Sequence, residues 1–232
     1  MPRYWQLAFC MLLGGCSLLP GNLERRLELP RLSVEGQEYY HLVNRLKSLD
    51  FTVDFDKLRL SWTFTPHYFL TLDSEKTALA AIHQLSSSGD FKGCLQKSGE
   101  VLLYNYTSLV AHNWASYCAY SQGMQQTAEY HSDLLDNLLY VLLATGDGDS
   151  PQAPWQVTGP GELSGLLLLL GMRIESIEPA REEEFANLVR IRAWDQIENR
   201  QRLFWADYSI PIARYSAAQE FMNTRIQPFD KE

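Results

Sequence analysis

The sequence contains no apolar run long enough to cross a membrane as a helix. A transmembrane helix needs about 20 consecutive apolar residues, and the apolar stretch from Trp5 to Leu13 is far shorter. Basic residues are also few, because 20 lysines and arginines stand against 28 aspartates and glutamates, for a formal net charge of −8. Nucleic-acid binding needs a basic surface that neutralises phosphates. We therefore expect no nucleic-acid partner.

The sequence also lacks the common catalytic and zinc-binding motifs. The 5 histidines form no His-Glu-x-x-His pair and no cluster with cysteine, and no Gly-x-Ser-x-Gly elbow is present. Gly148-Asp149-Ser150 resembles the start of the Gly-Asp-Ser-Leu hydrolases, but Pro151 replaces the leucine. The last histidine, His131, precedes the serine that it would have to activate. We expect no cofactor, no bound metal and no catalytic residue.

The start of the chain is typical of a lipoprotein export signal. Arg3 provides a positive charge, the run to Leu13 is apolar, and Gly14-Gly15 are small enough for a signal peptidase. Leu13-Gly14-Gly15-Cys16 resembles the lipobox of bacterial lipoproteins, in which the cysteine is acylated and becomes the first mature residue. The resemblance implies that residues 1–15 are removed and that Cys16 binds membrane lipid, with each buried methylene adding about 0.8 kcal/mol.

The residue after the lipobox cysteine bears on location. Ser17 is not the aspartate that retains such lipoproteins at the inner membrane of enterobacteria. The resemblance therefore favours the outer membrane, with the domain facing the periplasm. The alternative is an ordinary cleaved signal in which Cys16 follows two glycines by chance.

Two cysteines remain after the signal and the anchor are set aside. Cys94 and Cys118 fall in segments that we interpret as neighbouring helices. In an oxidising periplasm they can form a disulfide, or they can be two small buried apolar residues that never meet. Both alternatives stay open, because pairing cannot be deduced from sequence.

Turn residues and charge divide the chain into segments. Pro20, Gly21 and Pro30 mark an aperiodic tether, and the Gly146-to-Pro151 cluster separates two compositions. From Glu75 to Ala180 there are 11 acids and 4 bases, so the acidity belongs to the middle of the chain. We expect a signal peptide (1–15), the lipidated cysteine and tether (16–36), a mainly helical, repeat-like region (37–145), a small α/β part packed on the helices (146–215) and a polar C-terminal tail (216–232).

The first half of the domain has helical periodicity. Residues 37–49 predict a helix with one apolar face, residues 54–68 carry fewer helix signals, and residues 75–145 are helical with breaks at Gly89 and Gly123. These two glycines are 34 residues apart, the period of tetratricopeptide repeats. Ser116 and Ala128 then fall where that repeat needs small residues. Leucines between 134 and 143 indicate the main core helix.

The second half favours a small sheet. Residues 155–158 and 172–177 predict strands, and a helix from Pro160 to Gly171 lies between them. Residues 185–194 and 201–210 predict an antiparallel hairpin around Asn199. The sequence therefore predicts an α+β fold, with an N-terminal tetratricopeptide-like helical bundle followed by a small antiparallel sheet with one packed helix.

Several short motifs occur along the chain in an order that resembles a known family. They are Asp54-Phe55 with Leu58-Arg59, Gly146-Asp147-Gly148 with Ser150-Pro151, Glu162, and Leu203-Phe204-Trp205. Together with the helical middle they resemble the bacterial domain-of-unknown-function family number 4919, found in exported proteins. Gly161 stands where the family is expected to have a second glutamate, which puts a paired carboxylate in doubt. The resemblance implies no activity.

The acidic residues Asp147, Asp149 and Glu162 are the candidate functional loop. Alternate carboxylates could begin a calcium site, but an EF-hand starting at Asp147 would need glycine at Gln152 and glutamate at Thr158. A carboxylate of this loop together with Glu162 could also act as an acid/base pair on a glycan. Equally, they could close a turn and begin a helix.

Aromatic residues are dense in the middle of the chain. Tyr104, Tyr106, Trp114, Tyr117 and Tyr120 could form a partner-binding groove, since aromatic residues dominate interface hot spots. They could instead belong to the core, because they alternate between the faces of the predicted helices.

These observations favour a non-enzymatic, membrane-anchored lipoprotein of the cell envelope. We expect it to be an adaptor or scaffold that binds an envelope protein in the periplasm. The alternatives are an enzyme acting on envelope glycan or peptidoglycan, and a small-ligand binder, both using the region of Asp147, Asp149 and Glu162.

Overall fold

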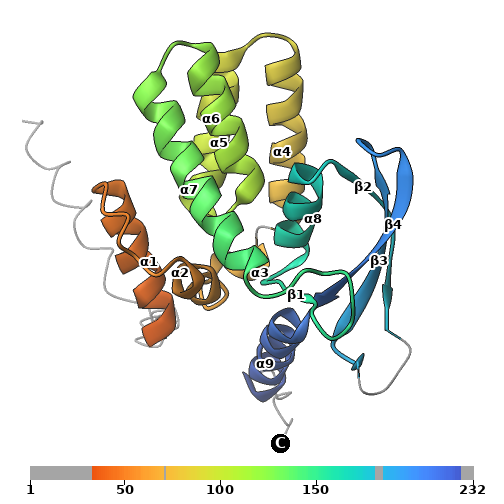
Figure 1. The fold of residues 1–232 in the computed structure, drawn as a ribbon. Helices are drawn as coiled ribbons and strands as arrows, with labels where there is room; N and C mark the ends of the chain where they lie inside the picture. Colours follow the sequence, from red (N-terminus) through yellow and green to blue (C-terminus); the bar gives the residue numbers. More distant parts are fainter. Residues whose placement is uncertain (1–32, 71, 181–184, 226–232) are drawn as a thin grey trace, which may run out of the picture. The chain divides into compact units, whose positions relative to one another are not determined.

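The computed structural model describes residues 33–70, 72–180 and 185–225 (Figure 1). The expected signal peptide, Cys16 and all but the end of the tether lie outside these residues. Among the described helices, none is both long and apolar enough to cross a bilayer. The helices are α1 (Val34–Lys47), α2 (Phe55–Trp62), α3 (His67–Leu70), α4 (Leu72–Ser87), α5 (Phe91–Tyr104), α6 (Leu109–Ser121), α7 (Gln125–Leu143), α8 (Pro160–Leu169) and α9 (Ser209–Arg225). The strands are β1 (Trp155–Gln156), β2 (Met172–Pro179), β3 (Leu188–Asp195) and β4 (Arg200–Asp207).

Helices α4 to α7 pack in chain order, each on the next (Figure 1). The breaks predicted at Gly89 and Gly123 are confirmed. A third break, between α5 and α6, was not predicted because it contains neither glycine nor proline. There the side chain of Asn105 accepts the backbone N–H of Thr107, at 3.1 Å, and forms the turn itself.

Two contacts hold these helices close together. The hydroxyl of Ser116 donates to the carbonyl of Ala128, at 2.9 Å, where the sequence indicated a close approach of α6 and α7. A disulfide joins Cys94 of α5 to Cys118 of α6. Both cysteines are fully buried, so the bridge lies within the helical core.

The N-terminal part of the domain is more helical than the sequence predicted. Helix α1 begins at Val34, inside the expected tether, because the side chain of Ser33 caps it by accepting the N–H of Gly36. Residues 54–68 contain α2 and the start of α3, although their helix signals are few. Asp54 caps α2 by accepting the N–H of Lys57, at 2.9 Å. A helix of this length is too short to show a clear period.

The four strands form one mixed sheet in the order β1-β4-β3-β2. Strands β2, β3 and β4 are antiparallel, and the predicted hairpin turns at Asn199, whose φ is +53°. The expectation of a purely antiparallel sheet is wrong in one respect, since β1 pairs with β4 in parallel. Helix α8 contacts β2 as well as α4 and α6, so it lies between the helices and the sheet (Figure 1).

The helices and the sheet share one apolar core. Leu134, Leu138 and Leu142 of α7 are fully buried, as the leucine pattern predicted, and they belong to the same cluster as Ile191 and Phe204 of the sheet. The α+β prediction is therefore confirmed. The small sheet completes the core of the helices and does not have a core of its own.

The C-terminal prediction needs correction. The last strand ends at Asp207, earlier than predicted, and helix α9 occupies much of the expected polar tail. The side chain of Asp207 accepts the N–H of Ser209 at the start of α9, at 2.7 Å. Pro211 suits a first turn, and the alanines that follow favour helix. Residues 226–232 lie outside the described part.

Candidate functional site

A buried ion pair connects two of the motifs recognised in the sequence. Arg59 of α2 has a relative exposure of 1%, and its Nε and Nη2 atoms donate to Oε1 and Oε2 of Glu162, at 2.7 and 3.0 Å. The side chain of Glu162 is only 6% exposed. Such a two-point contact between guanidinium and carboxylate is the strongest ion-pair geometry that proteins use. We call these two residues the Arg59–Glu162 centre.

The remaining bonds of Arg59 tie α2 to its surroundings. Nη2 also donates to the carbonyl of Gln156 in β1, at 2.9 Å, and Nη1 donates to Asp56, at 2.9 Å. Burial opposes the charge of Arg59, but the carboxylates of Glu162 and Asp56 outweigh it and raise the pKa of the guanidinium. Arg59 therefore stays charged and joins α2, β1 and α8.

Glu162 lies in the first turn of α8, where a negative charge is favoured. Its Oε2 atom accepts three hydrogen bonds, from Arg59 and from the N–H and the hydroxyl of Thr158, the last two at 2.7 and 3.0 Å. Both carboxylate oxygens are thus occupied by donors from the chain. In this arrangement Glu162 acts as an acceptor that positions the start of α8.

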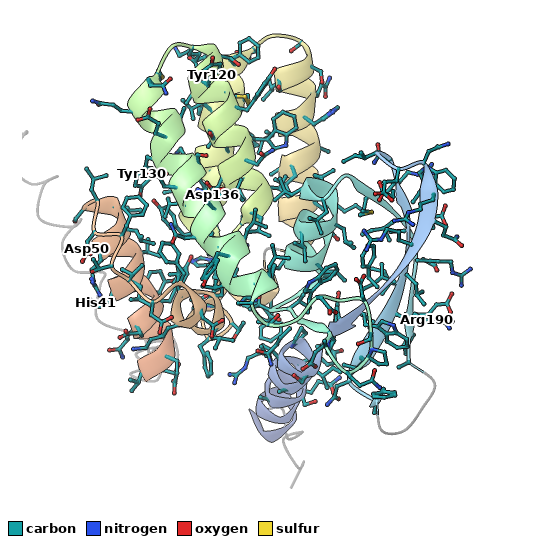
Figure 2. All side chains as sticks on the ribbon, in the orientation of Figure 1. His41, Asp50, Tyr120, Tyr130, Asp136 and Arg190 are labelled. Carbon is teal, nitrogen blue, oxygen red and sulfur yellow. A yellow bond between two sulfur atoms is a disulfide. The ribbon has the colours of Figure 1, made fainter. Side chains whose placement is uncertain are left out.

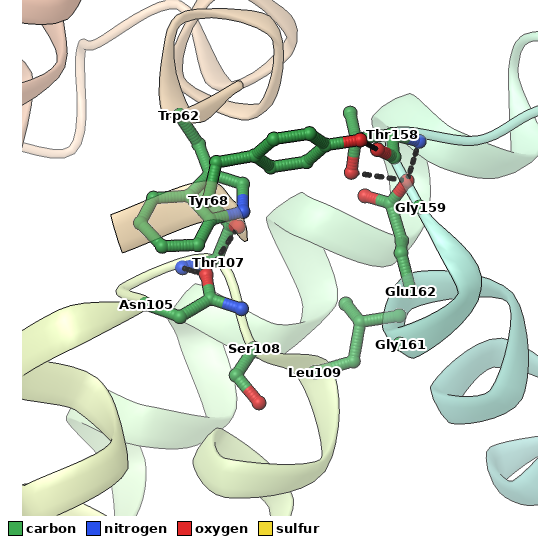
Figure 3. Close-up of a pocket in the computed structure, with 10 residues that line it drawn as sticks. All are labelled: Trp62, Tyr68, Asn105, Thr107, Ser108, Leu109, Thr158, Gly159, Gly161 and Glu162. Carbon is green, nitrogen blue, oxygen red and sulfur yellow. Dashed lines mark hydrogen bonds between the residues drawn. The ribbon is translucent and has the colours of Figure 1, made fainter. Parts of the chain in front are cut away.

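A small pocket lies beside this centre (Figure 3). Its volume is about 30 Å³, which is room for one or two water molecules. Tyr68 of α3 crosses one side and donates to the carbonyl of Thr158. Burial, with a smaller contribution from the charge of Glu162, raises the pKa of Tyr68 to about 12. The lining is Trp62, Tyr68, Asn105, Thr107, Ser108, Leu109, Thr158, Gly159, Gly161 and Glu162.

The other two acids of the candidate loop form a turn. The carboxylate of Asp147 accepts the N–H of Asp149, at 2.9 Å, and Asp149 pairs with Arg202 of β4, at 3.1 Å. Between them, Gly148 has a φ of +70°, and a Cβ there would lie 2.6 Å from the indole of Trp155. The glycine is required because the loop passes directly over this buried ring.

The structure therefore separates the three acidic candidates into two sets of contacts. Glu162 belongs to the Arg59–Glu162 centre, whereas Asp147 and Asp149 shape the loop over Trp155. From the sequence, Arg59 could be identified only as part of a motif, and its pairing with Glu162 could not be inferred. An arginine between Leu58 and Leu60 in an apolar segment was the available signal of a buried charge.

The aromatic candidates divide between the core and the surface. Tyr106 is buried, and Trp114 is half-buried with its ring against His83 and Tyr117. Tyr117 and Tyr120 of α6 are 49% and 68% exposed and line one hollow of about 370 Å³ between α6 and α7. Tyr104 is also exposed, but it does not line this hollow, and its ring lies against His67. The ring of Tyr117 likewise lies against Phe91 and Trp114.

The fully buried His112 of α6 contacts the half-buried His131 of α7, and no sequence pattern indicated this pair. The Nε2 atom of His112 is 3.0 Å from the carbonyl of Tyr106, so Nε2 must donate and Nδ1 must accept. Nδ1 of His131 lies 3.0 Å from that acceptor and therefore donates to it. Both rings are neutral, since burial lowers the pKa of His112 to about 3 and that of His131 to about 4.

Metal-binding groups do not gather anywhere in the described residues. Within 33–70, 72–180 and 185–225, no three histidine, cysteine, aspartate or glutamate side chains come close enough to hold a metal ion.

The fold and the buried centre define the class of this domain: an α+β domain in which an arginine–glutamate pair joins a helical layer to a small sheet. The chain belongs to the family described as domain of unknown function DUF4919, whose model matches residues 33–185. That range contains α1 to α8 and both residues of the Arg59–Glu162 centre. Neither a curated protein nor a solved structure matches the chain.

Proposed function

We propose that this chain is a membrane-anchored lipoprotein of the cell envelope that binds a protein partner in the periplasm and carries out no catalysis itself. The observation that carries the proposal is that the Arg59–Glu162 centre is occupied by its own donors and acceptors. Its charges hold the fold together. Tyr120 is 68% exposed, and Tyr117, whose ring also packs against Phe91 and Trp114, is 49% exposed. The exposed parts of these two rings are available for contact with another molecule.

The location rests on the lipobox pattern and is supported by the disulfide. Bridges such as Cys94–Cys118 persist in oxidising compartments, including the bacterial periplasm. Labelling cells with an alkyne-bearing palmitate and fractionating their membranes tests the anchor. The wild-type chain should carry label and sediment with membranes, and Cys16→Ala should do neither. Unchanged labelling of Cys16→Ala would show that the anchor is elsewhere.

The enzymatic alternative would place Asp147, Asp149 and Glu162 around one substrate bond. Their carboxylates are instead bonded to different partners, which supports the binding function over this alternative. The small-ligand alternative would use the neighbouring pocket, whose volume of about 30 Å³ suits water better than a metabolite.

A comparison of variants in solubilised envelopes tests the binding function. The wild-type chain, the Tyr117→Ala/Tyr120→Ala variant and an Ile197→Ala control are purified under identical conditions. Ile197 is 82% exposed but lies in the β3–β4 turn. One co-purified protein should fall at least tenfold with the tyrosine variant and not with the control. Equal recovery from all three would contradict the proposal.

A further inference from the structure

The hairpin of α6 and α7 exposes tyrosines and carboxylates together. Tyr117 and Tyr120 line the hollow between the two helices, and Glu129 of α7 lines it from the other side. Asp133 and Asp136 follow Glu129 at steps of four and three residues, which places the three exposed carboxylates on one face of the helix. Figure 2 labels Tyr120 and Asp136 on this hairpin. We call these five residues the tyrosine–carboxylate face.

The carboxylates of this face form no ion pair with basic side chains of the described residues, although Glu129 accepts a hydrogen bond from the side-chain amide of Gln125, at 2.7 Å. The sequence from Leu109 to Leu143 contains no lysine or arginine. In the described part of the chain, no ion pair includes Glu129, Asp133 or Asp136. Like charges four residues apart destabilise a helix. A positively charged partner would therefore relieve a repulsion that the isolated hairpin carries.

A neighbouring hollow shows the same chemistry within the chain. It lies between the end of α1 and α7, has a volume of about 690 Å³ and is lined by Lys47 together with Glu129 and Asp133, the first of which also lines the other hollow. There the ammonium of Lys47 lies 5.4 Å from the centre of the Tyr106 ring. Cations are attracted to tyrosine rings, and a guanidinium can also bind a carboxylate at two points. Arginine side chains suit a surface made of tyrosines and carboxylates.

We propose that the tyrosine–carboxylate face binds an extended segment of a protein partner that carries arginines at alternate positions. Alternate side chains of an extended segment point to one side, about 6.6 Å apart. Glu129 and Asp133 are about 6 Å apart along the helix axis. Two such arginines can therefore pair with both carboxylates at once. This inference rests on the proposed function, and it specifies the chemistry of the partner.

Fluorescence anisotropy with a labelled peptide tests the inference directly. The probe is Gly-Arg-Ser-Arg-Ser-Arg-Gly, titrated with the purified full chain in detergent at physiological salt. We expect saturable binding that weakens at least tenfold in Glu129→Gln/Asp133→Asn and in Tyr117→Ala/Tyr120→Ala. A peptide with glutamine in place of each arginine should not bind.

A matched control separates specific binding from general charge attraction. Glu175→Gln/Glu198→Gln also removes two negative charges, but from the sheet region. This variant should bind the peptide with an affinity within twofold of that of the wild-type chain. An equal loss in both pairs of variants, or equal binding of the glutamine peptide, would overturn the inference. So would the absence of saturable binding by the folded wild-type chain.

Failure of this inference can be distinguished from failure of the proposed function. If one envelope protein depends on Tyr117 and Tyr120 for recovery but the arginine peptide does not bind, the proposed function stands and the partner chemistry is wrong. If neither binds, both are wrong.

Discussion

Arg59 and Glu162 are 103 residues apart in the sequence and form a two-point ion pair in the interior of the domain. The pair joins α2 to α8, and a third bond from Arg59 reaches the carbonyl of Gln156 in β1. Asp54, which belongs to the same sequence motif, caps the helix that carries Arg59. The two sequence motifs that contain Arg59 and Glu162 therefore have a common structural role in this chain, which is to fix the helices against the sheet.

Removing one member of this pair should destabilise the fold strongly. Glu162→Gln leaves the guanidinium of Arg59 buried without its main counter-charge, and Arg59→Met leaves the carboxylate of Glu162 in the same condition. We expect each to lower the free energy of unfolding by about 3–5 kcal/mol, measured by urea denaturation. The double variant should lose less than the sum of the two.

Lys57→Met is the matched control for this cycle. Lys57 lies on the same helix and pairs with Glu38, but its side chain is 56% exposed, so the loss should stay below about 1 kcal/mol. Additive effects of Arg59→Met and Glu162→Gln would show that the two groups are not coupled.

The loop over Trp155 gives a second prediction. Gly148→Ala should destabilise more than Gly123→Ala, although both glycines have a φ near +70° (+70° and +73°). A Cβ at Gly123 has open space around it, whereas at Gly148 it meets the indole. We expect about 1 kcal/mol for Gly123→Ala and about 1–3 kcal/mol more for Gly148→Ala. Equal melting temperatures for the two variants would contradict the packing of the loop on Trp155.

The histidine pair predicts how stability depends on pH. The pKa values of His112 and His131 in the folded chain, about 3 and about 4, lie below the usual 6.5. Between the folded-state pKa values and 6.5, the unfolded chain therefore binds more protons than the folded chain does. The free energy of unfolding should fall as the pH falls from about 6.5 toward 4. Each histidine contributes a slope of up to about 1.4 kcal/mol per pH unit. His112→Gln/His131→Gln should flatten this slope in urea denaturation at pH 4–7. The exposed His41→Gln serves as the control, and an unchanged slope in the double variant would contradict the neutral pair.

The bridge between α5 and α6 predicts sensitivity to reduction. Cys94→Ala/Cys118→Ala removes a cross-link between residues 24 apart. For a loop of this length we expect a loss of about 2–4 kcal/mol. Dithiothreitol should lower the melting temperature of the wild-type chain and leave that of the variant unchanged. A wild-type chain that is equally stable with and without reductant would contradict the bridge.

The sequence predicted local structure better than contacts between distant segments. The leucines of α7, the glycine breaks and the Asn199 hairpin depend on periodicity and turn chemistry, which are local properties. The Arg59–Glu162 pair and the His112–His131 pair depend on how helices are brought together, and no spacing rule reveals them. Asp54 was visible in the sequence, but its capping role required the short helix α2, which has no clear period.

Two errors have identifiable physical causes. The beginning of helix α9 was expected to belong to the last strand and the small α/β part, and its second half to a polar tail. The segment shows little amphipathic pattern, and its three alanines favour a helix by propensity. The parallel pairing of β1 could not be foreseen from a strand of only two residues, Trp155 and Gln156. Of the candidate acids, Glu162 lies in the buried centre, while Asp147 and Asp149 build the adjoining loop.

In the proposed function, the exposed tyrosines of α6 contact a protein partner in the envelope. Photo-crosslinking in living cells tests it most directly, with a photoreactive residue placed in turn at Tyr117, Tyr120 and, as the control, Ile197. We expect one discrete protein adduct from the tyrosine positions and none from Ile197. No adduct from Tyr117 or Tyr120 in a folded, membrane-associated chain, or the same adducts from Ile197, would contradict it.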